Sequence, residues 1–186
     1  MKKSIMAAAL LMSLAVASFG TAASAAPPTK NIVGTAIAVN EETGKFDTLL
    51  AAATCGYLGT TVTDILASPD KTLFAPTDRA FRRLGEALGV DGGLRPGNVC
   101  SVDSLLGKDA LLTILGYHVI DDRVTYREAK QLIGTRVDML LGGKARIGGK
   151  PDAVKIDRSL ILIKNVRATN GIIHVVKNVL TPPAFS

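Results

Sequence analysis

The run Thr169–Pro183, TNGIIHVVKNVLTPP, constrains the fold most strongly. An Asn-Gly turn opens it, and strand alternation then places Ile172, His174 and Val176 on one face. The other face also begins with apolar β-branched residues, and the closing pair of prolines ends the strand because proline has no N–H to donate. A strand that is apolar on both faces belongs inside a sheet. We therefore expect a central strand, with one histidine in its middle, near the end of the chain.

The first 25 residues have the pattern of a cleaved secretory signal. Lys2 and Lys3 precede a short apolar stretch, Ile5–Val16, and Ala23-Ser24-Ala25 has the small-residue pattern of a cleavage site. The apolar stretch is shorter than the roughly 20 residues that a transmembrane helix needs, and no second hydrophobic span follows. We expect an exported protein, periplasmic or secreted, without a transmembrane span. The expected layout is a signal peptide (1–25), a short leader (26–30), one domain (31–183) and a C-terminal tail (184–186).

Two cysteines, Cys55 and Cys100, follow the expected signal. In an exported protein an even pair predicts one disulfide. It would close a loop of about 45 residues, for which the chain-entropy model gives roughly 4 kcal/mol of stabilisation. The chain has no C-x-x-C motif and no histidine near either cysteine, so a structural role is favoured over a redox or metal-binding one.

Helical periodicity fills the first part of the chain and strand alternation the last part. One buried strand, KTLFAP (Lys71–Pro76), interrupts the helical part, and Thr77 and Asp109 are expected to cap the helices that follow them. Helices before strands indicate an α+β fold. We expect helical segments between Asn31 and Ala53, at 63–66, 78–84, 102–106, 110–118 and 126–132, strands at 137–141, 145–147, 154–156, 160–166 and 171–179, and turns at Gly142-Gly143 and Gly148-Gly149.

Motifs for catalysis and cofactor binding are missing from the sequence. The chain has two histidines, His118 and His174, and neither an H-E-x-x-H motif nor a G-x-S-x-G elbow. The glycines around Lys150 lack the spacing of a phosphate-binding loop. We therefore expect neither an enzyme nor a bound cofactor or metal.

Positive charge is concentrated between Gly142 and Arg167. This segment holds seven basic residues against two acidic ones. Two interpretations remain open: a solvated hairpin face, or a patch for anionic polysaccharide, lipid headgroups or another acidic surface. Nucleic acid is not expected, because the protein is expected outside the cytoplasm and has no recognition motif. The basic residues are Lys144, Arg146, Lys150, Lys155, Arg158, Lys164 and Arg167.

Three segments resemble the fasciclin domain family. TLFAPTDRAF (Thr72–Phe81) matches a block of the type T-x-F-A-P-T-x-x-A-F, LLTILGYHVI (Leu111–Ile120) carries a Tyr-His pair, and ATNGIIHVVKNVLTPP (Ala168–Pro183) matches a closing N-G-x-I-H block. The resemblance extends over Asn31–Pro183, and the signal peptide and single domain resemble the small secreted or periplasmic bacterial members of the family. It implies a wedge-like β-sandwich with helices packed around it, and adhesion or matrix and cell-surface interactions rather than catalysis.

The same resemblance suggests site residues. The family's Tyr-His pair has been linked to adhesion, which makes Tyr117 and His118 candidates for an interaction surface; the alternative is that both are buried and hydrogen-bonded within the fold. His174 raises the same choice, and Asn170-Gly171 would supply the turn before the last strand.

One departure from the family narrows the choice of partner. Animal matrix members often carry Asp-Ile before the A-T-N-G sequence, a dipeptide tied to integrin binding, whereas this chain has Asn165-Val166. Integrin-type adhesion is therefore not expected.

The leading hypothesis is an interaction module for a protein or anionic polysaccharide at the cell surface or matrix. The alternative is a carrier for a small apolar ligand, such as a pigment or lipid, held between helices and sheet.

Overall fold

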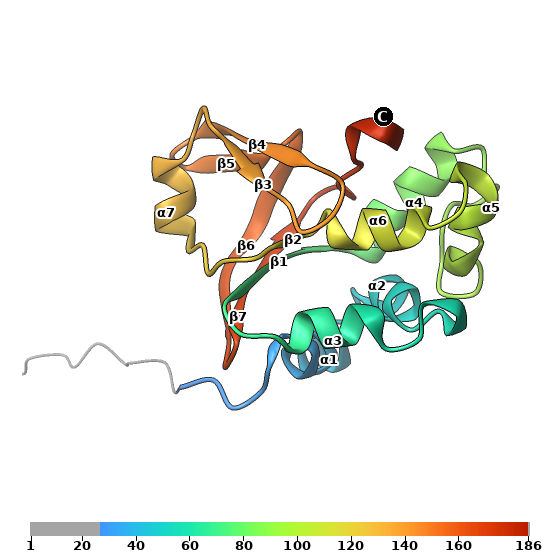
Figure 1. Cartoon of the computed structure of the whole chain (residues 1–186), viewed down its shortest axis with the longest axis horizontal. Coiled ribbons are helices and arrows are strands. Elements are labelled where there is room, and N and C mark those ends of the chain that lie inside the picture. The colour runs from blue at the N-terminus through green and yellow to red at the C-terminus, as the bar shows by residue number, and fades with distance from the viewer. Residues whose placement is uncertain (1–26, 186) are drawn as a thin grey trace, which may run out of the picture.

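The protein, described here by a computed structural model, combines one seven-stranded sheet with seven α-helices over residues 27–185 (Figure 1). The expected signal peptide, residue 26 and Ser186 lie outside the described residues. The helices are α1 (Ile32–Thr43), α2 (Asp47–Ala53), α3 (Thr61–Ala67), α4 (Asp78–Ala87), α5 (Val102–Leu106), α6 (Ala110–Gly116) and α7 (Tyr126–Gln131). The strands are β1 (Lys71–Pro76), β2 (Val119–Ile120), β3 (Arg136–Asp138), β4 (Lys144–Lys150), β5 (Ala153–Ile156), β6 (Ser159–Ala168) and β7 (Gly171–Val176).

The strands follow the order β2-β1-β7-β6-β5-β4-β3. β1 and β7 are parallel, and every other neighbouring pair is antiparallel. All six residues of β7 are buried, so the sequence prediction of a strand covered on both faces is confirmed. β7 therefore divides the molecule into two apolar regions.

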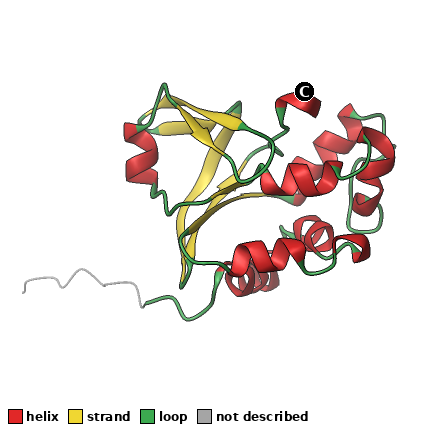
Figure 2. Cartoon of the chain, viewed as in Figure 1, coloured by secondary structure: helices red, strands yellow, loops and turns green. Residues whose placement is uncertain are grey.

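The two faces of β7 serve two different cores. Ile173 and Val175 pack against the core shared with helices α1 to α6, whereas Val176 belongs to a second core with β4, β5 and α7. The second core is enclosed because β3, β4 and β5 fold back over the long strand β6 and its neighbour β7 (Figure 1). Figure 2 shows most helices gathered on one side of the molecule, with α7 at the far end of the sheet. The expected α+β, sandwich-like fold is confirmed.

Glycines end elements at places that periodicity alone did not predict. The helical stretch expected between Asn31 and Ala53 is two helices, because Gly44 takes up a left-handed conformation (φ 58°) at the end of α1. The turn expected at Gly148-Gly149 is wrong: β4 continues through Lys150. A Cβ on Gly149 would lie 2.2 Å from the Ala153 carbonyl oxygen, so this glycine serves a close approach between strands.

Both expected helix caps are wrong in their chemistry. Thr77 and Asp109 stand at the starts of α4 and α6, but neither side chain accepts a capping hydrogen bond. Instead Asp103 Oδ1 accepts from the Leu111 N–H at 2.7 Å, within the first turn of α6. Asp78 Oδ1 likewise accepts from the Thr48 N–H of α2 at 2.7 Å. The carboxylates thus connect neighbouring helices rather than capping their own.

A disulfide joins Cys55, after α2, to Cys100, in the short 3₁₀ turn Val99–Ser101. The two Cα atoms lie 5.7 Å apart, within the usual range. Cys55 is buried in the helical core. The bond therefore links α2 to the segment that leads into α5, and no described cysteine is left free.

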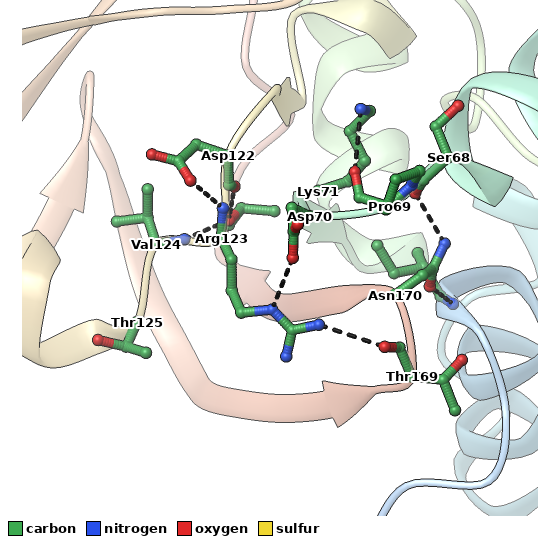
Figure 3. A network of polar contacts seen from close by, with 12 residues as sticks. Ser68, Pro69, Asp70, Lys71, Asp122, Arg123, Val124, Thr125, Thr169 and Asn170 are labelled. Atoms are coloured by element: carbon green, nitrogen blue, oxygen red, sulfur yellow. Dashed lines mark hydrogen bonds and ion pairs between the residues drawn. The ribbon is translucent and has the colours of Figure 1, made fainter.

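The Asn170 side chain joins three segments at the start of the parallel strand pair (Figure 3). Its Oδ1 accepts from the Ile32 N–H at 2.8 Å, and its amide donates to the carbonyls of Leu66 (2.8 Å) and Ser68 (3.0 Å). The Asn170 carbonyl also accepts from the Lys71 N–H at 3.2 Å. The side chain and backbone of one residue thus fix the start of α1, the end of α3 and the start of β1.

Gly171 has a different role from the turn residue that the sequence predicted. A Cβ here would lie 2.1 Å from the Lys71 carbonyl oxygen and 2.6 Å from Ile32 Cδ1. The absence of a side chain therefore permits the close parallel pairing of β7 with β1.

We expect Asn170→Asp to lower the free energy of unfolding by about 2–4 kcal/mol. The carboxylate keeps the acceptor for Ile32 but loses both donors and faces the carbonyls of Leu66 and Ser68. Chemical denaturation measures the change. The matched control is Asn31→Asp, because the Asn31 Oδ1 only accepts from the Gly34 N–H at 2.9 Å, a bond that aspartate keeps. Equal effects of the two substitutions would contradict the role assigned to Asn170.

Candidate functional site

The Tyr-His pair lies between α6 and β2 and its two side chains enter different parts of the molecule. Tyr117 packs in the second core and is 1% exposed. Its hydroxyl lies 2.9 Å from Asp157 Oδ2 and 3.1 Å from the Lys144 carbonyl oxygen. Burial, together with donation to the carboxylate, raises the pKa of the Tyr117 hydroxyl. Tyr117 therefore stays a neutral hydrogen-bond donor.

His118 is also 1% exposed, and both of its ring nitrogens are engaged. Nε2 accepts from the Leu180 N–H at 2.8 Å, so Nδ1 carries the proton and donates to the Ile114 carbonyl at 2.7 Å. Burial lowers the pKa of His118 to about 4. His118 thus fixes the segment after β7 to the end of α6, which favours a structural role over a surface one.

His174 has the opposite tautomer in the middle of β7. Its Nδ1 accepts from the Asn165 N–H at 3.3 Å, and Nε2 donates to the Val124 carbonyl at 3.0 Å. The ring is fully buried and stacks against Phe74, with 5.8 Å between the ring centroids. Burial lowers its pKa below the ordinary value. None of the three candidates Tyr117, His118 and His174 reaches the surface.

The seven basic residues named from the sequence do not form one patch. Arg146 of β4 lies opposite Arg136 of β3. Gly148 is on the same face of β4 as Arg146 and lies opposite Lys155 of β5, so Lys155 shares that face. Lys164 instead lies over the Tyr126 ring, 4.1 Å from its centroid. The outer face of β3 to β5 therefore carries Arg136, Lys144, Arg146, Lys150 and Lys155, while Arg167 opposes Ile172 on the β6–β7 ladder.

Four cations surround a hollow of about 640 Å³ between this outer face and the segment 178–183. We call it the basic hollow; its basic residues are Arg136, Lys144, Arg146 and Arg158. Asp157 is the acidic residue of its lining, and both of its oxygens are occupied: Oδ1 accepts from the Arg146 N–H at 2.8 Å and Oδ2 from Tyr117. The lining thus holds four positive charges against the one negative charge of Asp157.

Sequence reasoning missed Arg136 because it lies outside the basic segment. Only the pairing of β3 with β4 brings it opposite Arg146. The spacing of Arg136 and Asp138 indicates a strand with one charged face. The sequence does not show which strand lies beside it. Asp138 in turn pairs with Lys144 at 2.7 Å, an exposed contact of small energetic weight.

A second, apolar cavity of about 290 Å³ lies among the helices on the other side of the sheet. We call it the helical cavity. α1, α2 and α3 contribute most of its lining, and α6 with β1 and β2 closes it. Its lining consists of Ile32, Val33, Ala36, Ile37, Leu49, Leu50, Ala51, Ala53, Thr54, Val62, Thr63, Ile65, Leu66, Leu73, Leu112, Leu115, Gly116, His118 and Val119.

The family model of the fasciclin domain matches residues 44–182. The chain belongs to the fasciclin family. It is 34% identical over 147 residues to protein sll1483 of Synechocystis, and the aligned region covers 79% of this chain and 72% of the relative. It is 30% identical over 140 residues to the immunogenic protein MPB70 of Mycobacterium bovis (74% and 64%), and 30% identical over 155 residues to pig transforming growth factor-beta-induced protein ig-h3 (82% and 20%).

The fold of this fasciclin domain also resembles a solved structure, a FAS1 domain pair from the insect cell adhesion molecule fasciclin I. The two share 18% sequence identity at a TM-score of 0.50, over 81% of this chain and 47% of the other. In the present chain the three motif blocks fall on β1, on α6 with β2, and on β7, which are neighbours in the sheet order β2-β1-β7. The motif residues thus build the three consecutive strands at one edge of the sheet.

Two negative findings concern the part of the fasciclin domain that the structure describes. Within residues 27–185 no group of three or more histidine, cysteine or acidic side chains is arranged to hold a metal ion. None of the helices there has both the length and the hydrophobicity to cross a bilayer.

We expect the free energy of unfolding to fall as the pH drops from about 6.5 to about 4. The unfolded chain binds a proton at His118 near the ordinary pKa, whereas the folded chain resists it down to about 4. The contribution of neutral His118 to the free energy of unfolding is therefore fully present above pH 6.5. By pH 4 the free energy of unfolding has fallen by on the order of 3 kcal/mol because of this residue. Denaturant titrations across this pH range measure the slope.

The control for this pH dependence is His118→Gln. It removes the titrating ring, so the slope between pH 6.5 and 4 should become shallower, with His174 supplying the remainder. An unchanged slope would contradict the assignment to His118.

Proposed function

We propose that this protein is an exported, non-enzymatic interaction module that binds anionic polysaccharide at the cell surface or matrix through the basic hollow. The observation that carries the proposal is the gathering of Arg136, Lys144, Arg146 and Arg158 around one concave surface. The signal-like residues 1–25 support export, and the domain is proposed to span residues 31–183. The adhesion role named for the insect relative supports the choice of an interaction module.

The charges of the hollow suit carboxylates or sulfates repeated along a chain. Guanidinium groups bind such oxyanions with two parallel hydrogen bonds, and three of the four cations are arginines. The Asp157 carboxylate offsets one of these four charges, and its two oxygens already accept from Tyr117 and from the Arg146 N–H. Lys150 and Lys155 extend the same face beyond the hollow, so that a long polymer would meet charge along several repeats.

We expect the double substitution Arg136→Glu with Arg146→Glu to weaken binding to polygalacturonate at least tenfold, because two attractive charges become repulsive. Binding of the wild type should also weaken steeply between low and physiological salt, since exposed charges are screened over about 10 Å. Biolayer interferometry at two salt concentrations, with neutral dextran as the comparison polymer, measures both effects.

The matched control is Arg79→Glu with Lys108→Glu. It makes the same change in net charge at two exposed positions on the helical side of the molecule. It should leave polygalacturonate binding within about twofold of the wild type. Equal losses in both double variants would indicate a response to net charge alone, and salt-independent binding would refute the role of the hollow.

A further inference from the structure

The helical cavity differs from the basic hollow in both position and chemistry. Tyr117 lines the basic hollow and its neighbour His118 lines the helical cavity, so the two spaces lie on opposite sides of the chain between α6 and β2. Protein interiors are packed about as densely as organic crystals. A space of about 290 Å³ bounded by side chains from four helices and two strands is therefore room for a ligand.

We propose that the helical cavity binds one unbranched alkyl chain, such as the acyl chain of a lipid, with the polar end of the ligand at the cavity mouth. The lining leaves no free polar group to recognise anything else. The hydroxyl of Thr54 donates to the Leu50 carbonyl at 2.9 Å, and that of Thr63 to the Thr60 carbonyl at 2.8 Å. Both nitrogens of His118 are occupied. The remaining lining is hydrocarbon, apart from Gly116.

The exposure of the lining residues gives the cavity a direction. Ile37 on α1 is 41% exposed, a large apolar side chain at the surface, and Thr54 at the end of α2 is exposed as well. These residues mark the mouth. Leu73 of β1 and Val119 of β2 are each 3% exposed and mark the floor. A chain would therefore enter between α1 and α2 and end against the sheet.

The volume of the cavity limits the length of the chain that it can hold. At roughly 30 Å³ for a group of about the size of a water molecule, 290 Å³ accommodates about ten methylene groups. Each methylene moved from water into such a lining strengthens binding by about fourfold. Affinity should therefore rise with chain length up to about ten carbons and then level off.

Titration of the purified protein with straight-chain primary alcohols of six to sixteen carbons, by isothermal calorimetry, tests the proposal. We expect saturable one-to-one binding, with affinity increasing severalfold for each added carbon until about the tenth. The heat-capacity change should be negative, as for the burial of apolar surface. Absence of saturable binding across the series would overturn the proposal, as would tighter binding of a ringed alcohol such as retinol than of any straight chain.

Variants that fill the cavity provide the second arm. Ala36→Phe fills it from α1, and Ala53→Phe narrows its mouth from α2; each should weaken decanol binding at least tenfold. Ala36→Phe should also raise the melting temperature of the unliganded protein, because the new ring occupies existing space. Ala38→Phe, on α1 but outside the lining, is the matched control and should bind as the wild type does.

The two arms together separate a cavity site from surface partitioning. Equal binding by Ala36→Phe, Ala53→Phe and Ala38→Phe would overturn the proposal. Decanol binding should be unchanged in the Arg136→Glu, Arg146→Glu variant, so a failure of the polysaccharide proposal leaves this test intact. A loss of decanol binding in that variant, with unchanged stability, would count against an independent apolar site.

Discussion

The parallel pairing of β1 with β7, fixed at its start by the Asn170 amide, is the constraint on which the rest of the structure depends. Asn170 lies 138 residues from Ile32 and 104 from Leu66, and its side chain bonds to the backbone of both. Such distant segments meet only after the entropy of closing long loops has been overcome. One side chain with both a donor and an acceptor end satisfies three backbone groups there, which makes the junction specific as well as compact.

Because β7 is covered on both faces, the molecule has two apolar interiors with separate properties. Helices pack on one face, and the folded-back strands β3 to β5 with α7 pack on the other. The Tyr-His pair lies at the boundary and sends one side chain toward each interior. Burial keeps both side chains neutral near pH 7, by raising the pKa of Tyr117 and lowering that of His118. The pair thus connects the two halves of the fold.

Local patterns predicted most elements, but not the contacts between them. The strand at Lys71–Pro76 and the helices at 102–106 and near 126–132 follow from periodicity and agree with the structure. The capping roles expected for Thr77 and Asp109 failed because partners outside these helices take the N–H groups: the Asp78 N–H of α4 donates to the Lys45 carbonyl, and the Leu111 N–H of α6 donates to Asp103. Arg136 was missed for a similar reason, since its place opposite Arg146 depends on strand register. Register and long-range hydrogen bonds have no local sequence signal.

The residues that identify the family are largely occupied by the fold itself. Asn170, Gly171 and His174 hold β7 in place, and Asn165, which stands where animal matrix members often have an acid, takes up a left-handed conformation (φ 56°) and accepts from the Tyr126 N–H. These side chains have their hydrogen bonds within the protein and offer little to a partner. The outer face of β3 to β5 and the helices α1, α2 and α3, which supply most of the lining of the helical cavity, lie outside the motif blocks and remain free to differ in chemistry. A fasciclin domain of this kind can therefore keep one scaffold while the chemistry of these surrounding elements varies.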